Sequence, residues 1–188
     1  MIVAVILIIV SGLALYRSRL SSVVLALPVL LVTGNETSDF EFYADLYEYF
    51  GTINSFTTWL ILAKRPDFLL HGLLYLFSHL DISFRFTAFL LVAGTLYLFR
   101  SYAKNLQIGT QGFVTLFLCL RFSTLYSGFR TYLALSVFLF FWIVLEKRLL
   151  GVLLGSITHF SITLFSARYW KYLLILALLF LPYIVSIY

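Results

Sequence analysis

The sequence predicts an all-α fold, a polytopic bundle of about seven or eight transmembrane helices. Hydrophobic residues make up 62% of the 188 residues and charged residues only 11%, whereas soluble domains carry about 25% charged residues. Mean hydropathy is +1.02. The apolar residues fall in runs of about 13 to 19, close to the roughly 20 that cross a bilayer. We therefore expect one transmembrane domain over residues 1–188, because a soluble protein would lack the polar surface to cover this core.

The N-terminal half contains the runs whose lengths are hardest to interpret. Ile2–Tyr16 lacks the basic start and the cleavage site of a signal peptide and is predicted to be an uncleaved span. Val23–Val32 is a shorter second span with Pro28 inside it. Thr52–Ala63 is ambiguous, because a run this short either spans a locally thinned bilayer or lies in the interface. Six further apolar runs follow at Phe68–Leu80, Phe84–Phe99, Gln111–Ser127, Phe129–Leu145, Leu149–Phe165 and Trp170–Tyr188, and about seven or eight of the nine runs are expected to cross.

Residues 33–51 form an acidic, tyrosine-rich segment between these spans. It holds five of the eight acidic residues of the chain, namely Glu36, Asp39, Glu41, Asp45 and Glu48. Aromatic residues recur at steps of three and four, at Phe40, Tyr43, Tyr47 and Phe50, which is typical of an amphipathic helix on a membrane surface. A substrate-facing loop is the alternative interpretation of the same segment.

Basic residues favour one orientation of the chain, because cytoplasmic loops are enriched in lysine and arginine. If Arg17 and Arg19 are cytoplasmic and 52–63 counts as a span, the acidic segment and the N-terminus are outside. The cytoplasmic loops then contain Lys64 with Arg65, Arg100 with Lys104, and Lys147 with Arg148, and only Arg168 and Lys171 break the pattern. If residues 52–63 alone did not cross, three basic pairs would lie outside.

Three ionisable residues are predicted to lie inside or at the end of spans, where such groups are costly and usually functional. In the favoured orientation, Arg121, Arg130 and His159 all fall in the outer half of the bilayer, on the side of the acidic segment. Structural roles compete with function at each position. Arg130 could snorkel to the interface, Arg121 could form a buried pair, and His159 could join two helices by a hydrogen bond.

The chemistry of these residue types suits a lipid-linked sugar diphosphate. Arginine pairs bidentately with phosphate oxygens, so Arg130 and Arg121 are candidate ligands of the diphosphate. His159 or Asp39 could accept a proton from a sugar hydroxyl. Tyr43 and Tyr47 could stack on sugar rings.

Several other classes of site and partner are not expected. Cys119 is the single cysteine, so the chain forms no internal disulfide and offers no cysteine pair for a metal. We expect no metal and no cofactor, and the sequence has no Asp-x-Asp motif. Basic residues are scattered at helix ends, which does not suggest nucleic acid.

Three blocks resemble the EpsG-like branch of the Wzy-type polysaccharide (O-antigen, capsule or exopolysaccharide) polymerases of bacterial envelopes. Residues 39–43 with Tyr47 are similar to an Asp-Tyr…Tyr…Tyr run of that family. Residues 65–68, Arg-Pro-Asp-Phe, are similar to the charged entry of a family span. Residues 126–134 with 158–161 resemble an arginine-containing helix followed by a His-x-Ser segment. The match covers most of residues 2–165, although Thr131 replaces the glutamine that usually follows the arginine.

The resemblance implies a GT-C-like helical architecture and a glycosyltransferase in the inner membrane. Its partners would be membrane lipid, undecaprenyl-diphosphate-linked glycan as donor and acceptor, and a chain-length regulator. Since family members are commonly longer, a second hypothesis is a non-catalytic, truncated homologue that regulates or inhibits a polymerase. A polysaccharide or lipid transporter ranks lower, because we find neither paired midplane charges nor matching broken helices in two halves.

Overall fold

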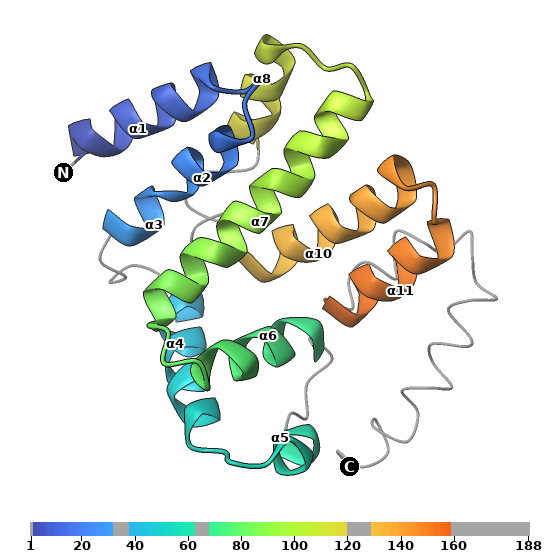
Figure 1. The fold of residues 1–188 in the computed structure, drawn as a ribbon. Coiled ribbons are helices and arrows are strands. Elements are labelled where there is room, and N and C mark those ends of the chain that lie inside the picture. The colour runs from blue at the N-terminus through green and yellow to red at the C-terminus, as the bar shows by residue number, and fades with distance from the viewer. Residues whose placement is uncertain (1, 32–37, 63–67, 120–128, 159–188) are drawn as a thin grey trace.

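The longest of the described helices, α7 (Phe84–Asn105), runs through the centre of the molecule (Figure 1). The structure is a computed structural model that describes residues 2–31, 38–62, 68–119 and 129–158. These residues are helical with connecting turns, and none of them forms a strand, which confirms the all-α prediction for the described part. The remaining elements are α1 (Ile2–Ala14), α2 (Leu20–Ala26), α3 (Pro28–Leu31), α4 (Ser38–Gly51), α5 (Phe56–Leu62), α6 (Phe68–Ser78), α8 (Thr110–Cys119), α10 (Phe129–Leu139), the π-helix η1 (Phe140–Val144) and α11 (Arg148–Thr158).

Helix α7 is long and apolar enough to cross a membrane. Its 22 residues extend about 33 Å at 1.5 Å per residue, which matches the hydrocarbon thickness of a bilayer. Among the described helices it is the one that meets this length and composition, and the other apolar helices are shorter. The expected seven or eight spans therefore stay a prediction.

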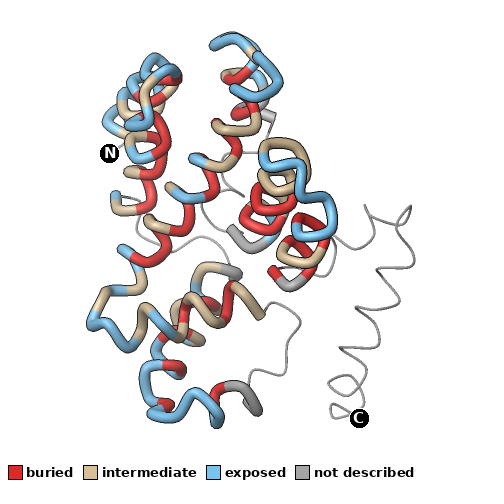
Figure 2. Tube along the Cα trace, turned by 45° about the vertical axis from the view of Figure 1, so that its right-hand side comes forward, coloured by how far each residue is buried: buried red, intermediate tan, exposed pale blue. Residues whose placement is uncertain are grey.

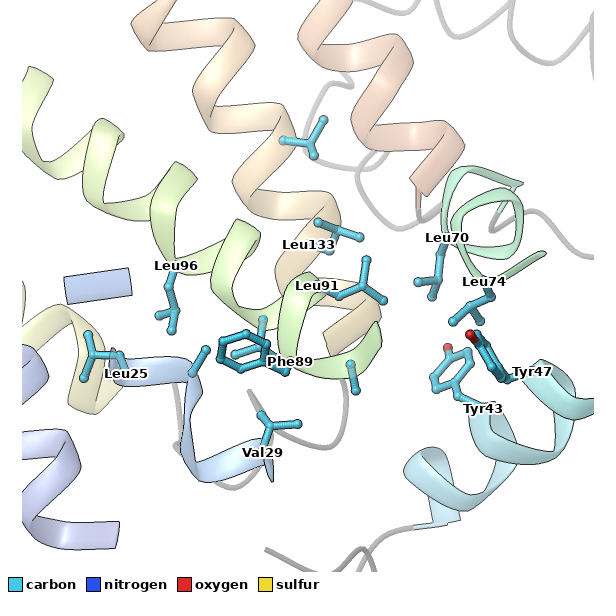
Figure 3. Close-up of a cluster of buried hydrophobic side chains, with 14 of the residues drawn as sticks. Leu25, Val29, Tyr43, Tyr47, Leu70, Leu74, Phe89, Leu91, Leu96 and Leu133 are labelled. Carbon is cyan, nitrogen blue, oxygen red and sulfur yellow. The ribbon is translucent and has the colours of Figure 1, made fainter. Parts of the chain in front are cut away.

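The central position of α7 follows from its sequence. Ser83 caps its N-terminus by accepting a hydrogen bond from the Phe86 backbone N–H. Buried residues recur every three or four positions, as expected of a helix with a continuous packed face. Leu96 and Phe89 contribute to the core that includes Leu25 and Val29, and Leu91 lies beside Leu133 of α10 (Figure 3). Figure 2 shows that the buried residues of α7, α10 and α11 face one another.

Helices α1 and α2 form a close antiparallel pair at Gly12. A Cβ atom on Gly12 would lie 2.6 Å from Leu25 Cγ, so the approach requires glycine. The hydroxyl of Ser21 donates to the Gly12 carbonyl oxygen across 2.7 Å. The outward residues of α1 are exposed hydrophobics, including Ile2, Val3, Ile6, Leu7 and Val10.

Arg100 attaches this helical pair to α7. Its side chain is 4% exposed, and its Nε and Nη2 atoms donate to the carbonyl oxygens of Tyr16 and Arg17, each across 2.8 Å. Lys104 Nζ donates to the same Arg17 carbonyl across 3.1 Å. Carbonyl groups just past a helix C-terminus favour a cation, and their hydrogen bonds offset the cost of burying the guanidinium. The Tyr16 hydroxyl extends the link by donating to Ile108.

Helices α10 and α11 form a second hairpin, connected through η1. The hydrogen bond from the Leu145 N–H to the Phe140 carbonyl spans five residues, as in a π-helix. Glu146 then adopts φ 56°, which ends the helical path. Asn105 at the end of α7 donates to the Ile143 carbonyl oxygen. Helix α10 therefore runs beside α7 in the same direction, and α11 returns antiparallel to it (Figure 1).

Candidate functional site

In the part of the chain that the structure describes, the two ends of the bundle carry opposite net charge, although Glu146 lies at the basic end and Arg85 at the acidic end. One end, here called the basic end, gathers the C-terminal part of α7 and two turns, linked by the Arg100, Lys104 and Asn105 hydrogen bonds. Its basic residues are Arg17, Arg19, Arg100, Lys104, Lys147 and Arg148. The other end, here called the acidic end, consists of α4, α5, α6 and the turn of residues 79–83, and lies at the bottom of Figure 1.

Helix α4 presents three acidic residues outward. Glu41, Asp45 and Glu48 are exposed, at spacings of four and three residues that place them on one face. The segment is thus an amphipathic helix from Ser38 to Gly51, as one of the two sequence interpretations expected. Asp39, a candidate proton acceptor, lies in the first turn of this helix.

Tyr43 and Tyr47 belong to the buried face of α4. Their exposed fractions are 2% and 7%, and both rings point toward Leu70 and Leu74 of α6 (Figure 3). The Tyr47 hydroxyl donates to the Ile82 carbonyl oxygen across 2.5 Å and accepts a hydrogen bond from Thr87. In this conformation the rings are covered by protein, so packing rather than sugar stacking is the role that the geometry gives them.

The other candidate residues are placed only in part. Arg130 is the second residue of α10, and α10 begins beside the N-terminal half of α7 (Figure 1). Arg121 and His159 lie outside the described residues. Helix α11 ends at Thr158, toward α6 and hence toward the acidic end. The start of α10 and the end of α11 therefore both lie away from the basic end.

An aromatic cluster behind α4 completes the acidic end. The ring of Trp59, 1% exposed, lies 5.2–5.3 Å from the rings of Phe56, Phe68 and Tyr75. Phe56 is 59% exposed and stacks on Trp59 from outside. The cluster therefore offers one open aromatic face, next to a turn whose exposed residues include Thr52, Asn54 and Ser55.

His79 joins this cluster to the turn after α4. Its Nδ1 atom lies 2.9 Å from the Tyr75 carbonyl oxygen, and its Nε2 atom lies 3.0 Å from the Ile53 carbonyl oxygen. The imidazole ring packs on Tyr75 with 4.3 Å between centroids. Sequence reasoning missed His79 as a candidate. The four-residue spacing of Tyr75 and His79 was a local signal, whereas the contact with Ile53 joins residues 26 positions apart.

Comparison of the chain with family models, with curated proteins and with solved structures finds no match. The similarity of the three sequence blocks to the EpsG-like polymerases stays a prediction. The arguments for function therefore come from the charge, the exposure and the position of the residues at the acidic end.

Proposed function

We propose that the chain is a multi-pass membrane glycosyltransferase that polymerises undecaprenyl-diphosphate-linked repeat units at the outer face of the bacterial inner membrane. The observation that carries the proposal is the polarity of the bundle along α7. Acidic, hydroxyl-bearing and aromatic side chains are exposed at one end, including Glu48, Ser55 and Phe56, and six basic residues lie at the other. By the preference of basic loops for the cytoplasm, the acidic end faces outward, where the glycan would be assembled.

The lengths of α5 and α6 bear on this topology. The described parts of α5 and α6 have 7 and 11 residues on either side of residues 63–67, which the structure does not describe, whereas a spanning helix needs about 20 residues. If the pair enters and returns on the same side, the order of the later loops is unchanged, because two crossings are removed together. The three basic pairs of the basic end then stay cytoplasmic. This topology keeps those three pairs cytoplasmic but moves Lys64 and Arg65, between α5 and α6, away from the cytoplasmic side.

In the proposed reaction, a hydroxyl oxygen of the acceptor repeat unit attacks the anomeric carbon of the donor glycan. A new glycosidic C–O bond forms while the bond from the anomeric carbon to the diphosphate breaks, and its electron pair leaves with undecaprenyl diphosphate. Arg130, assisted by Arg121, neutralises the charge that grows on the diphosphate. The hydroxyl proton passes to His159 or Asp39. Phe56 provides the open aromatic face for a sugar ring.

The test replaces Arg130 by alanine in a polymerase-null strain and measures glycan chain length on gels. We expect loss of long chains. Arg85→Ala is a matched control, because Arg85 is exposed and is the second residue of α7, as Arg130 is of α10. Arg85→Ala should keep long chains. Wild-type chain length in the Arg130 variant, at equal membrane abundance, would reject the assignment.

Co-expression with an intact polymerase separates the enzyme from a regulator. An enzyme leaves chain length unchanged or longer. A non-catalytic homologue that binds the same substrate or the polymerase shortens the chains, and it does not restore polymer in the null strain. That pair of results would replace the proposed function.

A further inference from the structure

The basic end combines exposed cations with exposed leucines. Lys104 and Leu106 are both exposed at the end of α7, and Lys147, Arg148 and Leu149 are exposed at the η1–α11 turn. The Asn105 hydrogen bond to Ile143 holds these two turns together. A surface that alternates leucine with lysine or arginine is suited to the boundary between lipid headgroups and acyl chains.

A second observation favours lipid over a soluble partner. The exposed face of α1, including Ile6 and Val10, leads along the bundle to the turn that carries Arg17 and Arg19. An apolar helical face that ends at exposed basic residues has the order expected of a protein crossing from hydrocarbon into a headgroup layer. A soluble acidic protein would have no complement for the apolar face.

We propose that the basic end is a binding surface for the phosphate groups of anionic phospholipids. The cations of Arg19, Lys104 and Arg148 pair with lipid phosphates, while Leu106 and Leu149 insert among the first methylenes of the acyl chains. Arg100 acts as a positioning residue: its hydrogen bonds to the Tyr16 and Arg17 carbonyls hold the first basic turn beside α7.

This inference rests only on the membrane location within the proposed function and is independent of glycosyl transfer. Binding at this end would fix the orientation and depth of the bundle. The two ideas fail separately, since lipid affinity is measured on the isolated chain and polymerisation is measured in cells.

The experiment titrates the detergent-solubilised full chain with phosphatidylglycerol or phosphatidylcholine and determines the Kd of the first bound lipid by native mass spectrometry. Arg148→Gln should weaken phosphatidylglycerol binding about fivefold, which is the expected contribution of one basic residue near an anionic surface. Arg85→Gln removes one exposed charge at the opposite end of α7 and should change this Kd less than about twofold. Phosphatidylcholine affinity should be equal in all variants.

A second variant tests whether weaker phosphatidylglycerol binding could result from a folding defect. Arg19 is exposed, and its side chain makes no capping hydrogen bond to α2, so Arg19→Gln should fold normally and also weaken phosphatidylglycerol binding. The proposal is overturned if both variants retain wild-type affinity for phosphatidylglycerol. An equal loss in Arg85→Gln would overturn it as well, because binding would then reflect net charge alone.

Discussion

At Gly151 the chain packs α11 against the end of α10 without room for a side chain. A Cβ atom there would lie 2.9 Å from the Phe138 carbonyl oxygen and 3.0 Å from the Trp142 backbone nitrogen. Both are backbone atoms, which cannot move aside as a flexible side chain can. The close approach also brings Gly151 against the start of the π-helix, whose geometry depends on the surrounding packing.

We expect Gly151→Ala to lower the thermal midpoint of the purified chain, by an amount corresponding to about 1–3 kcal/mol of overpacking. Gly94→Ala is the matched control, because a Cβ atom at Gly94 in α7 meets nothing within 4 Å. It should leave the midpoint unchanged or raise it, since alanine is favoured over glycine in a helix by up to about 1 kcal/mol. Equal midpoints for the two variants would show that the α10–α11 approach is not tight.

The sequence predicted which residues share a helix face better than it predicted what that face contacts. The sequence indicates that Tyr43 and Tyr47 share a face with Phe50, and the structure confirms that grouping. It does not reveal whether that face meets lipid, sugar or protein, because all three accept aromatic side chains. The partners of Tyr47, at Ile82 and Thr87, are 35 and 40 residues away, beyond the reach of a local pattern.

Among the elements, α4 depends on a few anchoring contacts. The Phe40 and Tyr47 rings lie 5.0 and 5.5 Å from that of Phe84, the first residue of α7. The Tyr47 hydroxyl ties the same helix to the turn before α7. Because the outer face of α4 is charged and exposed, these contacts on the inner face determine where the acidic surface lies.

Tyr47→Phe should therefore destabilise the docking of α4. The change leaves the ring in place but removes the hydroxyl, so the Ile82 carbonyl loses its donor and the Thr87 hydroxyl its acceptor. We expect a cost of about 1–3 kcal/mol, seen as a lower thermal midpoint. Tyr49→Phe serves as control, because Tyr49 is 49% exposed and surface changes usually stay within about 0.5 kcal/mol. A Tyr47 variant as stable as the Tyr49 variant would refute the anchoring role.

Element boundaries show where sequence patterns stop being informative. The periodic aromatic residues predicted the helix α4. The long apolar run predicted a span that begins at Phe84, and α7 begins at that residue, after its capping residue Ser83. The predicted span at 129–145 instead divides into α10 and the π-helix η1. Helix α11 approaches the chain closely at this division, at Gly151, and a local sequence pattern does not encode such a tertiary contact.

At the scale of the whole molecule, the grouping of basic pairs follows from a physical rule. Four basic pairs, Arg17 with Arg19, Lys64 with Arg65, Arg100 with Lys104, and Lys147 with Arg148, were expected on one side because basic loops remain cytoplasmic. In the structure the pairs at 17–19, 100–104 and 147–148 occupy one end of the bundle, and Lys64 with Arg65 lies outside the described residues. The number of crossings could not be predicted in the same way, since helix length depends on packing as well as on hydropathy.

Because α7 connects the acidic end to the basic end, labelling one residue at each end tests the orientation of the chain in the membrane. Cys119 is the single cysteine, so a Cys119→Ser background allows one reporter at a time. Asn54→Cys places an exposed thiol at the acidic end, and Thr110→Cys places one at the basic end. In intact cells a membrane-impermeant maleimide should label position 54 and leave position 110 unlabelled, while both should react after permeabilisation. Labelling of position 110 but not of position 54 would show the opposite orientation, with the acidic end in the cytoplasm. A reaction at the outer face could not use the acidic end in that orientation. Labelling of both in intact cells would mean that α7 does not separate the two ends across a membrane.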